Sequence, residues 1–473
     1  MEVIVFFGAS KYGELILNKF LEEDRIAGKE VFFCDNSSQK CGQNFHGYRV
    51  LSPEELLGFE NPVIVIASQY SAQIAFQLFQ MGIKEYHVAV ALEEGGRLQL
   101  ERFNCSGIQN TDIISNKICL IADNFSGSNT RALYKMIPEQ YRGKLIIKLL
   151  DIKNKQEDFY YDLFTARVVI SNQGTVSARE GQILIELWHG FPLKCMGYMV
   201  DSYDKINRFT SEMWNSNHLV ASYSALYTAL MSACFGVSGK SFKTTGMPRN
   251  DFLFKTDRTN NLSKILKNEK EYVKTVLYAP TFRKIETQYE EAIERNLSNV
   301  FGFEDFKEDK FCQFIERYNI RFILKFHPVE EKQLLEQIHR INNDNVFVLN
   351  DELLKDHKID FYELLNECDL MITDYSSLYF DFLLLDRPII FTPVDLEQYR
   401  RTRGLLLEPY GFWAPGVQAV NQNDLEQALW ENLFGKDRYQ EERSVVRKIV
   451  HHHEDERSSE RLWGEIVRFI PSL

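Results

Sequence analysis

The sequence lacks several features that would assign a protein to a class directly. Eight cysteines are present, and no two of them are spaced C-x-x-C; they lie at positions 34, 41, 105, 119, 195, 234, 312 and 368. Neither a zinc site nor a disulfide scaffold is therefore predicted, and we expect reduced, cytosolic thiols. No run of about 18 uncharged apolar residues occurs, so no membrane-spanning helix is predicted. The sequence starts with Glu2 and a short apolar run, which is not typical of a secretion signal.

A surplus of basic charge is also missing. The formal net charge is -12 and the pI is about 5.5, which argues against a protein that coats nucleic acid with a basic surface. An anionic ligand would have to be bound by a local group of side chains. The sequence has no Walker loop, G-x-x-x-x-G-K-[ST], and no acidic cluster typical of a two-metal site. We expect no metal ligands, and the need for a divalent ion stays open.

What is present indicates a globular protein of about three domains, since the chain has 473 residues, 44% of them hydrophobic. Residues 1–92 have the pattern of a small α/β domain, with strands predicted at 3–7, 30–34, 63–67 and 86–90. A turn from Gly8 to Gly13 follows the first strand and Asp35 follows the second, as in a Rossmann-like sheet. Because G-x-x-x-x-G replaces G-x-G-x-x-G, a dinucleotide site and a simple glycine turn are both open.

After a polar segment at 93–116, predicted as a linker, two further α/β regions follow. The first, 117–259, has strands predicted at 118–122, 144–150, 168–171 and 183–187. The second, 260–436, has strands predicted at 275–278, 321–325, 346–349, 370–373 and 388–391. Helical patterns between the strands predict parallel sheets. The last segment, 437–473, is charged and helical, and we predict that the three histidines at 451–453 form a solvated helix end.

Four polar clusters directly follow four of the predicted strands. They are Trp188-His-Gly-Phe-Pro-Leu-Lys194, Pro280-Thr-Phe-Arg283, Phe326-His-Pro328 and Asp374-Tyr-Ser-Ser377. In open α/β sheets, ligands bind beyond the carboxyl ends of the strands, so a site is expected at these places. One cluster precedes residue 260 and three follow it, which predicts a cleft between two domains.

Two histidines are candidates for different roles. His189 could act as a general base near neutral pH, and Gly190 beside it would let a ligand approach the backbone; a purely structural histidine is the alternative. His327, between Lys325 and the turn at Pro328, is better suited to hydrogen-bonding a phosphate.

Serines and acids mark the other side of the predicted cleft. Ser376 and Ser377 open a helix, where unpaired N–H groups favour anions; simple N-capping is the alternative. Asp381, one turn further on the same face, could accept a hydrogen bond from a hydroxyl of the same ligand or be a solvated acid.

Two arginines are candidates for phosphate contacts. Arg283 could clamp a phosphate with two hydrogen bonds or lie on the surface. Arg249 could contact the same ligand or pair with Asp251. Together these residues predict transfer from a nucleotide-linked donor whose diphosphate is held by cations and helix N-termini.

The clusters as a set resemble a known family. The segments Trp188–Lys194, Gly246–Asp251, Leu277–Arg283, Phe326–Pro328 and Ile372–Phe382, followed by Asp386-Arg-Pro388, are similar in order and spacing to the CDP-glycerol glycerophosphotransferase family. This family includes teichoic acid primases and polymerases and their capsule-polymer relatives. The resemblance covers residues 117 to about 435. It implies a GT-B architecture, with two facing Rossmann-like domains and a C-terminal helical segment that crosses back to the first of them.

The resemblance also implies roles for individual residues. His189 would deprotonate the acceptor hydroxyl, and the loop from Trp188 through Gly190 and Phe191 to Pro192 would line the donor site. The CDP-linked donor would be contacted by Arg249, Pro280, Thr281, Lys325, Phe326, His327, Ser376, Ser377 and Asp381, and the reaction would expel CMP. Phe191, Phe282 and Lys325 depart from residues common in the family, so glycerol, ribitol and sugar phosphates are all open as the transferred group.

Rival functions and the expected partners follow from the same comparison. A GT-B glycosyltransferase that uses a CMP- or CDP-activated sugar is one rival, and a non-catalytic nucleotide-binding scaffold for capsule assembly is another. The family implies a CDP-alditol donor, a polymer or lipid-linked acceptor, and a cytoplasmic place at the inner face of the bacterial membrane. Residues 1–92 are similar instead to a small domain at the front of some sugar-modifying acyltransferases and capsule enzymes.

Overall fold

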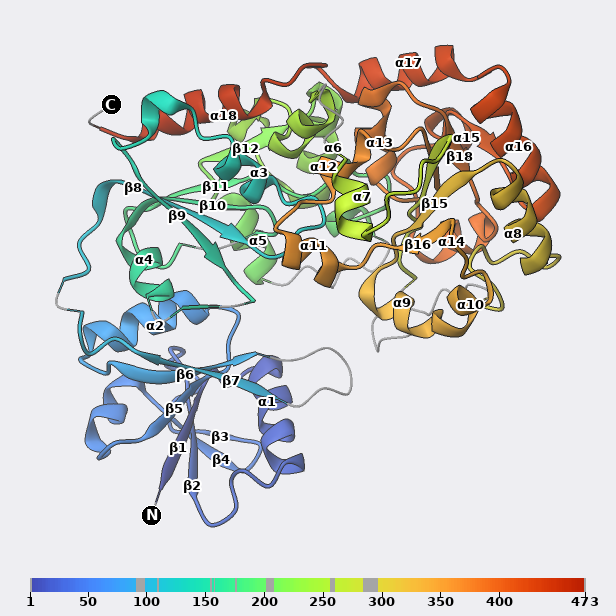
Figure 1. The fold of residues 1–473 in the computed structure, drawn as a ribbon. Coiled ribbons are helices and arrows are strands. Elements are labelled where there is room, and N and C mark those ends of the chain that lie inside the picture. Colours follow the sequence, from blue (N-terminus) through green and yellow to red (C-terminus); the bar gives the residue numbers. More distant parts are fainter. Residues whose placement is uncertain are drawn as a thin grey trace.

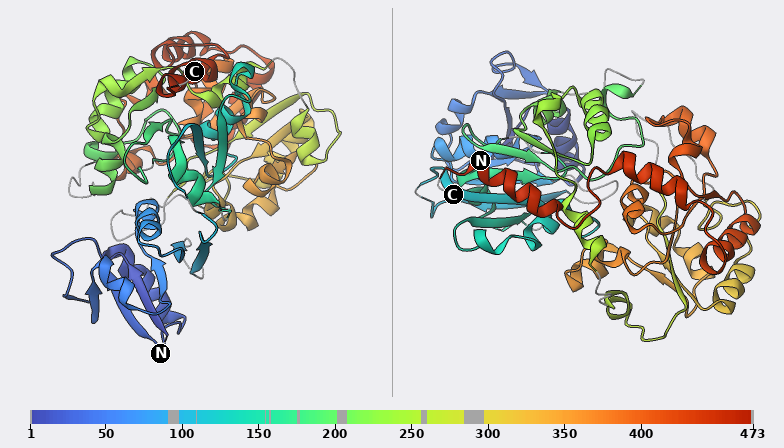
Figure 2. Two further views of the ribbon diagram at one scale, coloured as in Figure 1. Left: turned by 90° about the vertical axis from the view of Figure 1, so that its left-hand side faces the viewer. Right: turned by 90° about the horizontal axis from the view of Figure 1, so that it is seen from above.

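Three β-sheets organise the protein in a computed structural model that describes residues 2–90, 98–108, 110–153, 155–156, 158–174, 177–200, 208–255, 260–283 and 297–471 (Figure 1). The first sheet forms a front domain, and the other two face each other in the rest of the molecule (Figure 2). Within the described residues, no helix is long and apolar enough to cross a membrane.

The front sheet has the strand order β3-β4-β2-β1-β5-β6-β7. Its strands are β1 (Val3–Phe7), β2 (Glu30–Cys34), β3 (Asn44–Phe45), β4 (Tyr48–Leu51), β5 (Val63–Ile66), β6 (Glu85–Val90) and β7 (Gln99–Asn104), with helices α1 (Lys11–Glu22) and α2 (Ser71–Gln80). The sequence predicted residues 93–116 as a linker, but β7 pairs antiparallel with β6 along its whole length. The front domain therefore extends beyond residue 92, and β7 forms its edge.

Side chains of the front domain itself bond to the backbone of the turn between Gly8 and Gly13. Asp35 accepts from the Ala9 N–H at 3.0 Å, and Lys40 donates to both Asp35 and the Ala9 carbonyl. A Cβ at Gly8, whose φ is +130°, would lie 2.4 Å from the Ala67 carbonyl oxygen, so this position requires glycine for packing alone.

The second sheet is entirely parallel, with the order β13-β12-β11-β10-β8-β9. Its strands are β8 (Ile114–Ala122), β9 (Ile146–Asp151), β10 (Ala166–Ser171), β11 (Ile183–Glu186), β12 (Leu219–Ser222) and β13 (Phe242–Thr244). The helices around it are α3 (Asn129–Lys135), α4 (Phe159–Thr165), α5 (Arg208–Asn215) and α6 (Ala225–Phe235). Its central strands β10, β11 and β12 consist mainly of aliphatic residues buried on both faces, as the interior of a parallel sheet requires.

The third sheet is also parallel and has the order β16-β15-β14-β17-β18-β19, which is the Rossmann order. Its strands are β14 (Lys274–Tyr278), β15 (Ile320–Leu324), β16 (Val346–Val348), β17 (Leu370–Thr373), β18 (Ile389–Phe391) and β19 (Val417–Gln418). Its helices are α7 (Asn261–Leu266), α8 (Glu308–Arg317), α9 (Pro328–Gln333), α10 (Leu335–Arg340), α11 (Asp351–His357), α12 (Tyr362–Leu365), α13 (Leu378–Phe382), α14 (Leu396–Thr402), α15 (Tyr410–Trp413) and α16 (Gln422–Phe434).

The C-terminal helices lie across both halves, as Figure 2 shows in red. Helix α17 (Gln440–Val450) packs beside the third sheet, whereas α18 (Ser458–Ile466) packs on the second. The carboxylate of Asp251 accepts from the N–H groups of Ser458 and Ser459, and the Trp463 indole donates to the Leu133 carbonyl. The prediction of a solvated histidine end is wrong for His451, which is buried and bonded to the Phe380 carbonyl.

Candidate functional site

A cleft of about 1130 Å³ lies between the second and third sheets. Its walls are the loops that follow β8, β10 and β11 on one side and β14, β15 and β17 on the other. In each sheet the strand order reverses here, between β8 and β10 and between β14 and β17. Such reversal points leave a crevice at the carboxyl ends of the strands, so the fold places two ligand crevices face to face.

Most of the predicted site residues meet in this cleft. Its lining includes His189, Arg249, Pro280, Thr281, Lys325, Phe326, His327, Ser376 and Ser377. The predicted residues Trp188, Gly190, Phe191, Pro192, Arg283 and Asp381 are not part of its lining. The ring of Phe191 is buried and packs against Tyr223, Tyr227 and Phe380, so its bulk fills the domain junction and not the space for the transferred group.

His189 is exposed to the cleft, and a backbone contact fixes its tautomer. Its Nδ1 lies 3.0 Å from the Asn172 carbonyl oxygen. Because a carbonyl can only accept, Nδ1 carries the proton and Nε2 keeps the lone pair that a general base needs. Loss of hydration within the cleft lowers the pKa of His189, and the positive charge of Arg249 lowers it further, against the effect of the Asn172 contact. The imidazole is therefore in its basic form at neutral pH.

The loop that carries His189 is held at several backbone atoms. Trp188 has a φ of +53°, a conformation that costs energy for a residue other than glycine, and its ring packs on His189 with centroids 4.0 Å apart. Asn129 donates to the Trp188 carbonyl at 2.9 Å, and Arg249 donates to the His189 carbonyl at 3.0 Å. These bonds offset the strained turn and fix the direction of the imidazole.

Glu186 was missed by sequence reasoning, because it stands at the end of an apolar strand and belongs to no motif. Its carboxylate is fully buried and accepts from Trp188 N–H at 2.7 Å, Gly174 N–H at 2.9 Å and the Ser171 hydroxyl at 2.5 Å. Burial raises the pKa of Glu186 to about 7, although these three donors act in the opposite direction. Glu186 thus ties the base loop to the segment that includes Asn172, the partner of His189.

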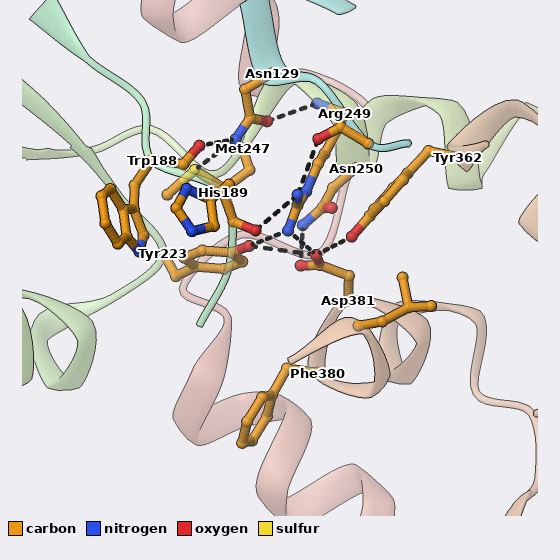
Figure 3. Close-up of polar contacts among 12 residues, drawn as sticks. Asn129, Trp188, His189, Tyr223, Met247, Arg249, Asn250, Tyr362, Phe380 and Asp381 are labelled. Atoms are coloured by element: carbon orange, nitrogen blue, oxygen red, sulfur yellow. Dashed lines mark hydrogen bonds and ion pairs between the residues drawn. The ribbon is translucent and has the colours of Figure 1, made fainter. Parts of the chain in front are cut away.

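Arg249 and Asp381 form a buried ion pair between the two halves (Figure 3). Arg249 Nη2 lies 2.7 Å from Asp381 Oδ2, which also accepts from Tyr362 at 2.6 Å, while Oδ1 accepts from Asn250 at 2.9 Å. The alternatives from the sequence, a solvated Asp381 and an Arg249–Asp251 pair, are wrong. Asp381 holds the arginine and is not placed to meet a ligand.

Arg283 is buried, so the alternative of a surface arginine is wrong. Its guanidinium pairs with Asp395 at 2.9 Å and Asp374 at 2.9 Å and donates to the Thr281 carbonyl at 2.7 Å. Asp374 also accepts from the Thr281 N–H at 2.7 Å. In this arrangement Arg283 ties the loops after β14 and β17 together, which favours support of the cleft wall over a direct phosphate contact.

The cationic wall of the cleft comes from the third sheet. Lys325 pairs with Asp351 at 2.7 Å, and Ser126 of the other half donates to the same carboxylate at 2.7 Å. Asp351 was missed by sequence reasoning, because nothing local marks it. The ring of His327 stacks on Phe282 with centroids 4.2 Å apart, and the imidazole is exposed.

Ser377 lies against Gly190 of the other half, beside Ser376. Ser377 holds the N-cap position of α13 but makes no capping bond, and Ser376 Oγ accepts from the Leu378 N–H at 3.4 Å, so simple N-capping does not account for the pair. A Cβ at Gly190 would lie 2.5 Å from Ser377 Oγ. The missing side chain of Gly190 therefore admits Ser377 and brings the serine pair next to the base loop. Helix α13 has five residues, so its dipole adds little here.

The arrangement sets one base opposite a group of cations and hydroxyls. Lys194 and Arg249 of the second-sheet half and Lys325 of the third-sheet half bring positive charge to the cleft, with the ring of His327 beside Lys325, which suits a diphosphate. His189 is suited to take a proton from a hydroxyl. Among the described residues there is no group of three or more side chains that could hold a metal ion.

Two parallel sheets with facing crevices and a C-terminal helix shared by both define a GT-B fold. The wall teichoic acid polymerase TagF has this fold in common with the chain, with a TM-score of 0.61 at 19% identity over 76% of this chain and 90% of that structure. Residues 127–468 match the family described as CDP-Glycerol:Poly(glycerophosphate) glycerophosphotransferase, and the chain belongs to this family.

Relatives of known name agree with this assignment. The teichoic acid ribitol-phosphate polymerase TarK of Staphylococcus aureus is 29% identical over 308 residues, which are 62% of this chain and 54% of TarK. A teichoic acid glycerol-phosphate primase of Bacillus spizizenii is 27% identical over 293 residues, 60% of this chain and 67% of the primase. The chain spans about half the length of TarK and of the related polymerase TarL, 54% and 48%. Residues 1–89 match a separate family, described as C2185-like, N-terminal.

Proposed function

We propose that the protein transfers an alditol phosphate, glycerol phosphate in the first instance, from a CDP-linked donor to a hydroxyl group of a cell-surface polymer and releases CMP. The observation that carries this proposal is the cleft itself. It sets the lone pair of His189 opposite the serines and cations of the third sheet. Family membership supplies the donor class, and a variant of TagF has been soaked with CDPG.

In the proposed reaction His189 takes the proton of the acceptor hydroxyl as its oxygen attacks the phosphorus that bears the alditol. The bond from this phosphorus to the oxygen that bridges to CMP breaks, and CMP leaves with the bridging oxygen. Lys325, His327 and the hydroxyls of Ser376 and Ser377 offset the negative charge on the phosphoryl oxygens. Positioning and electrostatic stabilisation supply most of the rate in such transfers. We place the reaction at the cytoplasmic face of the membrane, where a growing polymer and a nucleotide donor meet.

The role of His189 is tested by His189→Ala in the full chain. CMP release from CDP-glycerol in the presence of an oligo(glycerol phosphate) acceptor should fall by about 10²–10⁴-fold, while donor affinity changes little, because a base acts on the acceptor proton. His357→Ala is a suitable control, since His357 bonds the Leu353 carbonyl of its own helix. If turnover is unchanged in His189→Ala, His189 is not the general base.

The serine pair is tested by the double substitution of Ser376 and Ser377 to Ala. We expect the donor Kd, measured calorimetrically with CDP-glycerol, to rise by about tenfold, because two hydroxyl contacts to a charged group are lost.

The type of reaction is tested with the wild type, by comparing CMP-sugar and CDP-ribitol donors with CDP-glycerol. If phosphate from the donor never enters the product, the reaction is a glycosyl transfer and the proposed function is wrong.

A further inference from the structure

The front domain is fixed against the second sheet by a shared apolar core. Phe76 of α2 packs on Phe164 of α4 with centroids 5.2 Å apart, and Phe103 of β7 packs edge-on against Tyr160 at 4.6 Å. Residues of both domains belong to one continuous buried cluster. In Figure 1, α2 lies between the front sheet and α4. Buried aromatic contacts of this kind hold the front domain in one orientation.

Polar contacts at the rim of this interface help to fix the orientation of the front domain. Tyr70 donates to Glu212 of α5 at 2.8 Å. Lys155 pairs with Glu101 of β7 at 2.5 Å, and both side chains are mostly shielded, with exposures of 13% and 15%. Shielded pairs are screened less by salt than surface pairs, so they contribute to the orientation of β7.

Strand β7 brings two side chains of the front domain into the cleft that holds His189. Gln99 and Glu101, two positions apart and so on one face of the strand, are part of the cleft lining together with Lys153 and Gln173. A second cavity, of about 170 Å³, lies between α2 and α4 and shares Asp123, Ile152 and Gln173 with the cleft. The hollow that begins at the catalytic base therefore continues to the surface of the front domain.

The two ends of the cleft present different polar groups. The third-sheet end presents the Lys325–Asp351 pair, His327 and the hydroxyls of Ser376 and Ser377, whereas the end near the front domain presents Gln99, Glu101, Asp123, Lys153 and Gln173. Carboxylates repel a diphosphate but accept hydrogen bonds from hydroxyl groups, and amides can donate and accept. Glu101 retains acceptor capacity beside Lys155, because a carboxylate has about four lone-pair sites.

We propose that the front domain forms part of the acceptor site, in which Gln99 and Glu101 bind hydroxyl groups of the polyol or sugar unit that is attacked by the donor phosphorus. This inference rests on the proposed function, because it assigns the acceptor to the end of the cleft opposite the diphosphate. The front domain then determines which polymer is extended, and His189 lies between its strand β7 and the donor.

The test uses the full chain with CDP-glycerol at saturation and a synthetic oligo(glycerol phosphate) acceptor of varied concentration. Gln99→Ala should raise the acceptor KM by about fivefold, and Gln99→Ala combined with Glu101→Ala by more, because each substitution removes a hydrogen bond to a hydroxyl. The donor KM should stay unchanged in both. Arg102→Ala is the matched control, since Arg102 lies on the other face of β7 and pairs with exposed Glu85.

The outcomes separate this inference from the proposed function. If the wild-type protein releases no CMP from any CDP-linked donor with any acceptor, the proposed function fails. If the wild type transfers but the variants keep the acceptor KM, or raise the donor KM equally, the front domain does not bind the acceptor. Gln99 is exposed and its side chain bonds to no other residue in the described part of the chain, so Gln99→Ala alone gives a clear result even if the double variant is unstable.

Discussion

At the scale of single residues, the site depends on groups that hold His189 and its loop in place. The orientation of His189 depends on the Asn172 carbonyl, and the loop around it depends on Glu186, Asn129 and Arg249. These bonds are 2.7 to 3.0 Å long and partly buried, so a partner that is lost leaves a polar group poorly hydrated. Glu186 is the one whose protonation can change near neutral pH.

Glu186→Gln tests this support. The folded-state pKa of Glu186 is raised from 4.5 to about 7, so the folded protein takes up a proton as the pH falls through 7 while the unfolded chain does not. The wild type therefore gains stability from pH 8 to pH 5.5, by about 2 kcal/mol as an order of magnitude, and the variant lacks this gain. Calorimetric Tm values at the two pH values measure the difference.

The activity of the same variant provides an independent readout. Glutamine keeps one acceptor oxygen, but its amide N–H groups must face either the Trp188 N–H or the Gly174 N–H, which are donors themselves. The loop that carries His189 is then held less well, so kcat should fall by about tenfold with little change in donor KM. Glu180→Gln, which removes an exposed carboxylate from the same half, is the control. Equal pH dependence of Tm in wild type and variant would show that Glu186 stays charged.

At the scale of elements, the loop after β11 and the start of α13 touch at Gly190 and Ser377. Gly190→Ala should lower stability by about 1–2 kcal/mol and raise the donor KM, because the new methyl group would lie 2.5 Å from Ser377 Oγ and 3.1 Å from its Cβ. Adding Ser377→Gly should restore part of the stability. Tm is measured for the two single variants and the double variant. If the Tm loss of the double variant equals the sum of the two single losses, the Gly190→Ala methyl group does not clash with Ser377.

Gly464→Ala is the matched control for that substitution. Gly464 lies inside α18, and a Cβ there would meet nothing within 4 Å. Alanine in a helix interior is favoured over glycine, so this variant should gain about 0.5–1 kcal/mol.

Most elements of the two large sheets could be predicted from the sequence, but some could not. Apolar runs such as 370–373 and 183–186 mark buried parallel strands locally. Strand β7, Gln-Leu-Glu-Arg-Phe-Asn, has no such run, because it is an edge strand whose pairing with β6 is decided by the fold. The cleft was predictable because its polar clusters directly follow these strands in the sequence. The roles of Asp381 and Arg283 were not predictable, since their partners, such as Arg249 and Asp395, lie more than a hundred residues away.

At the scale of the whole molecule, the two halves are joined by buried charge and by backbone bonds. Leu406 N–H donates to the Leu193 carbonyl at 2.8 Å, and Cys195 N–H donates to the Gly404 carbonyl at 3.2 Å, directly after the base loop. Asp360 of the third-sheet half accepts from the N–H groups of Gly127 and Ser128, at the start of α3. The base and the donor wall are therefore held in one fixed relation.

Asp381→Ala tests the ion pair at the centre of this junction. It would leave the Arg249 guanidinium buried without its carboxylate, and removal of one partner of a buried pair costs about 3–5 kcal/mol. Calorimetry should show a lower Tm, and turnover should fall as well because Arg249 also holds the His189 carbonyl. Glu336→Ala, which breaks an exposed pair with Arg340, should leave the Tm nearly unchanged. Similar Tm losses in both variants would contradict a special role for the buried pair.

The packing of α18 has a consequence for the order in which the protein folds during synthesis. Leu462, Trp463 and Ile466 are fully buried in the core that includes Ile118, Leu120 and Leu133 of the second-sheet half. In the chain, however, these residues come after every strand of the third sheet. On the ribosome, the second-sheet half must therefore wait with an open apolar surface until the third-sheet half has been made. The half that carries His189 becomes complete only after the half that carries Lys325 and the serine pair has been made.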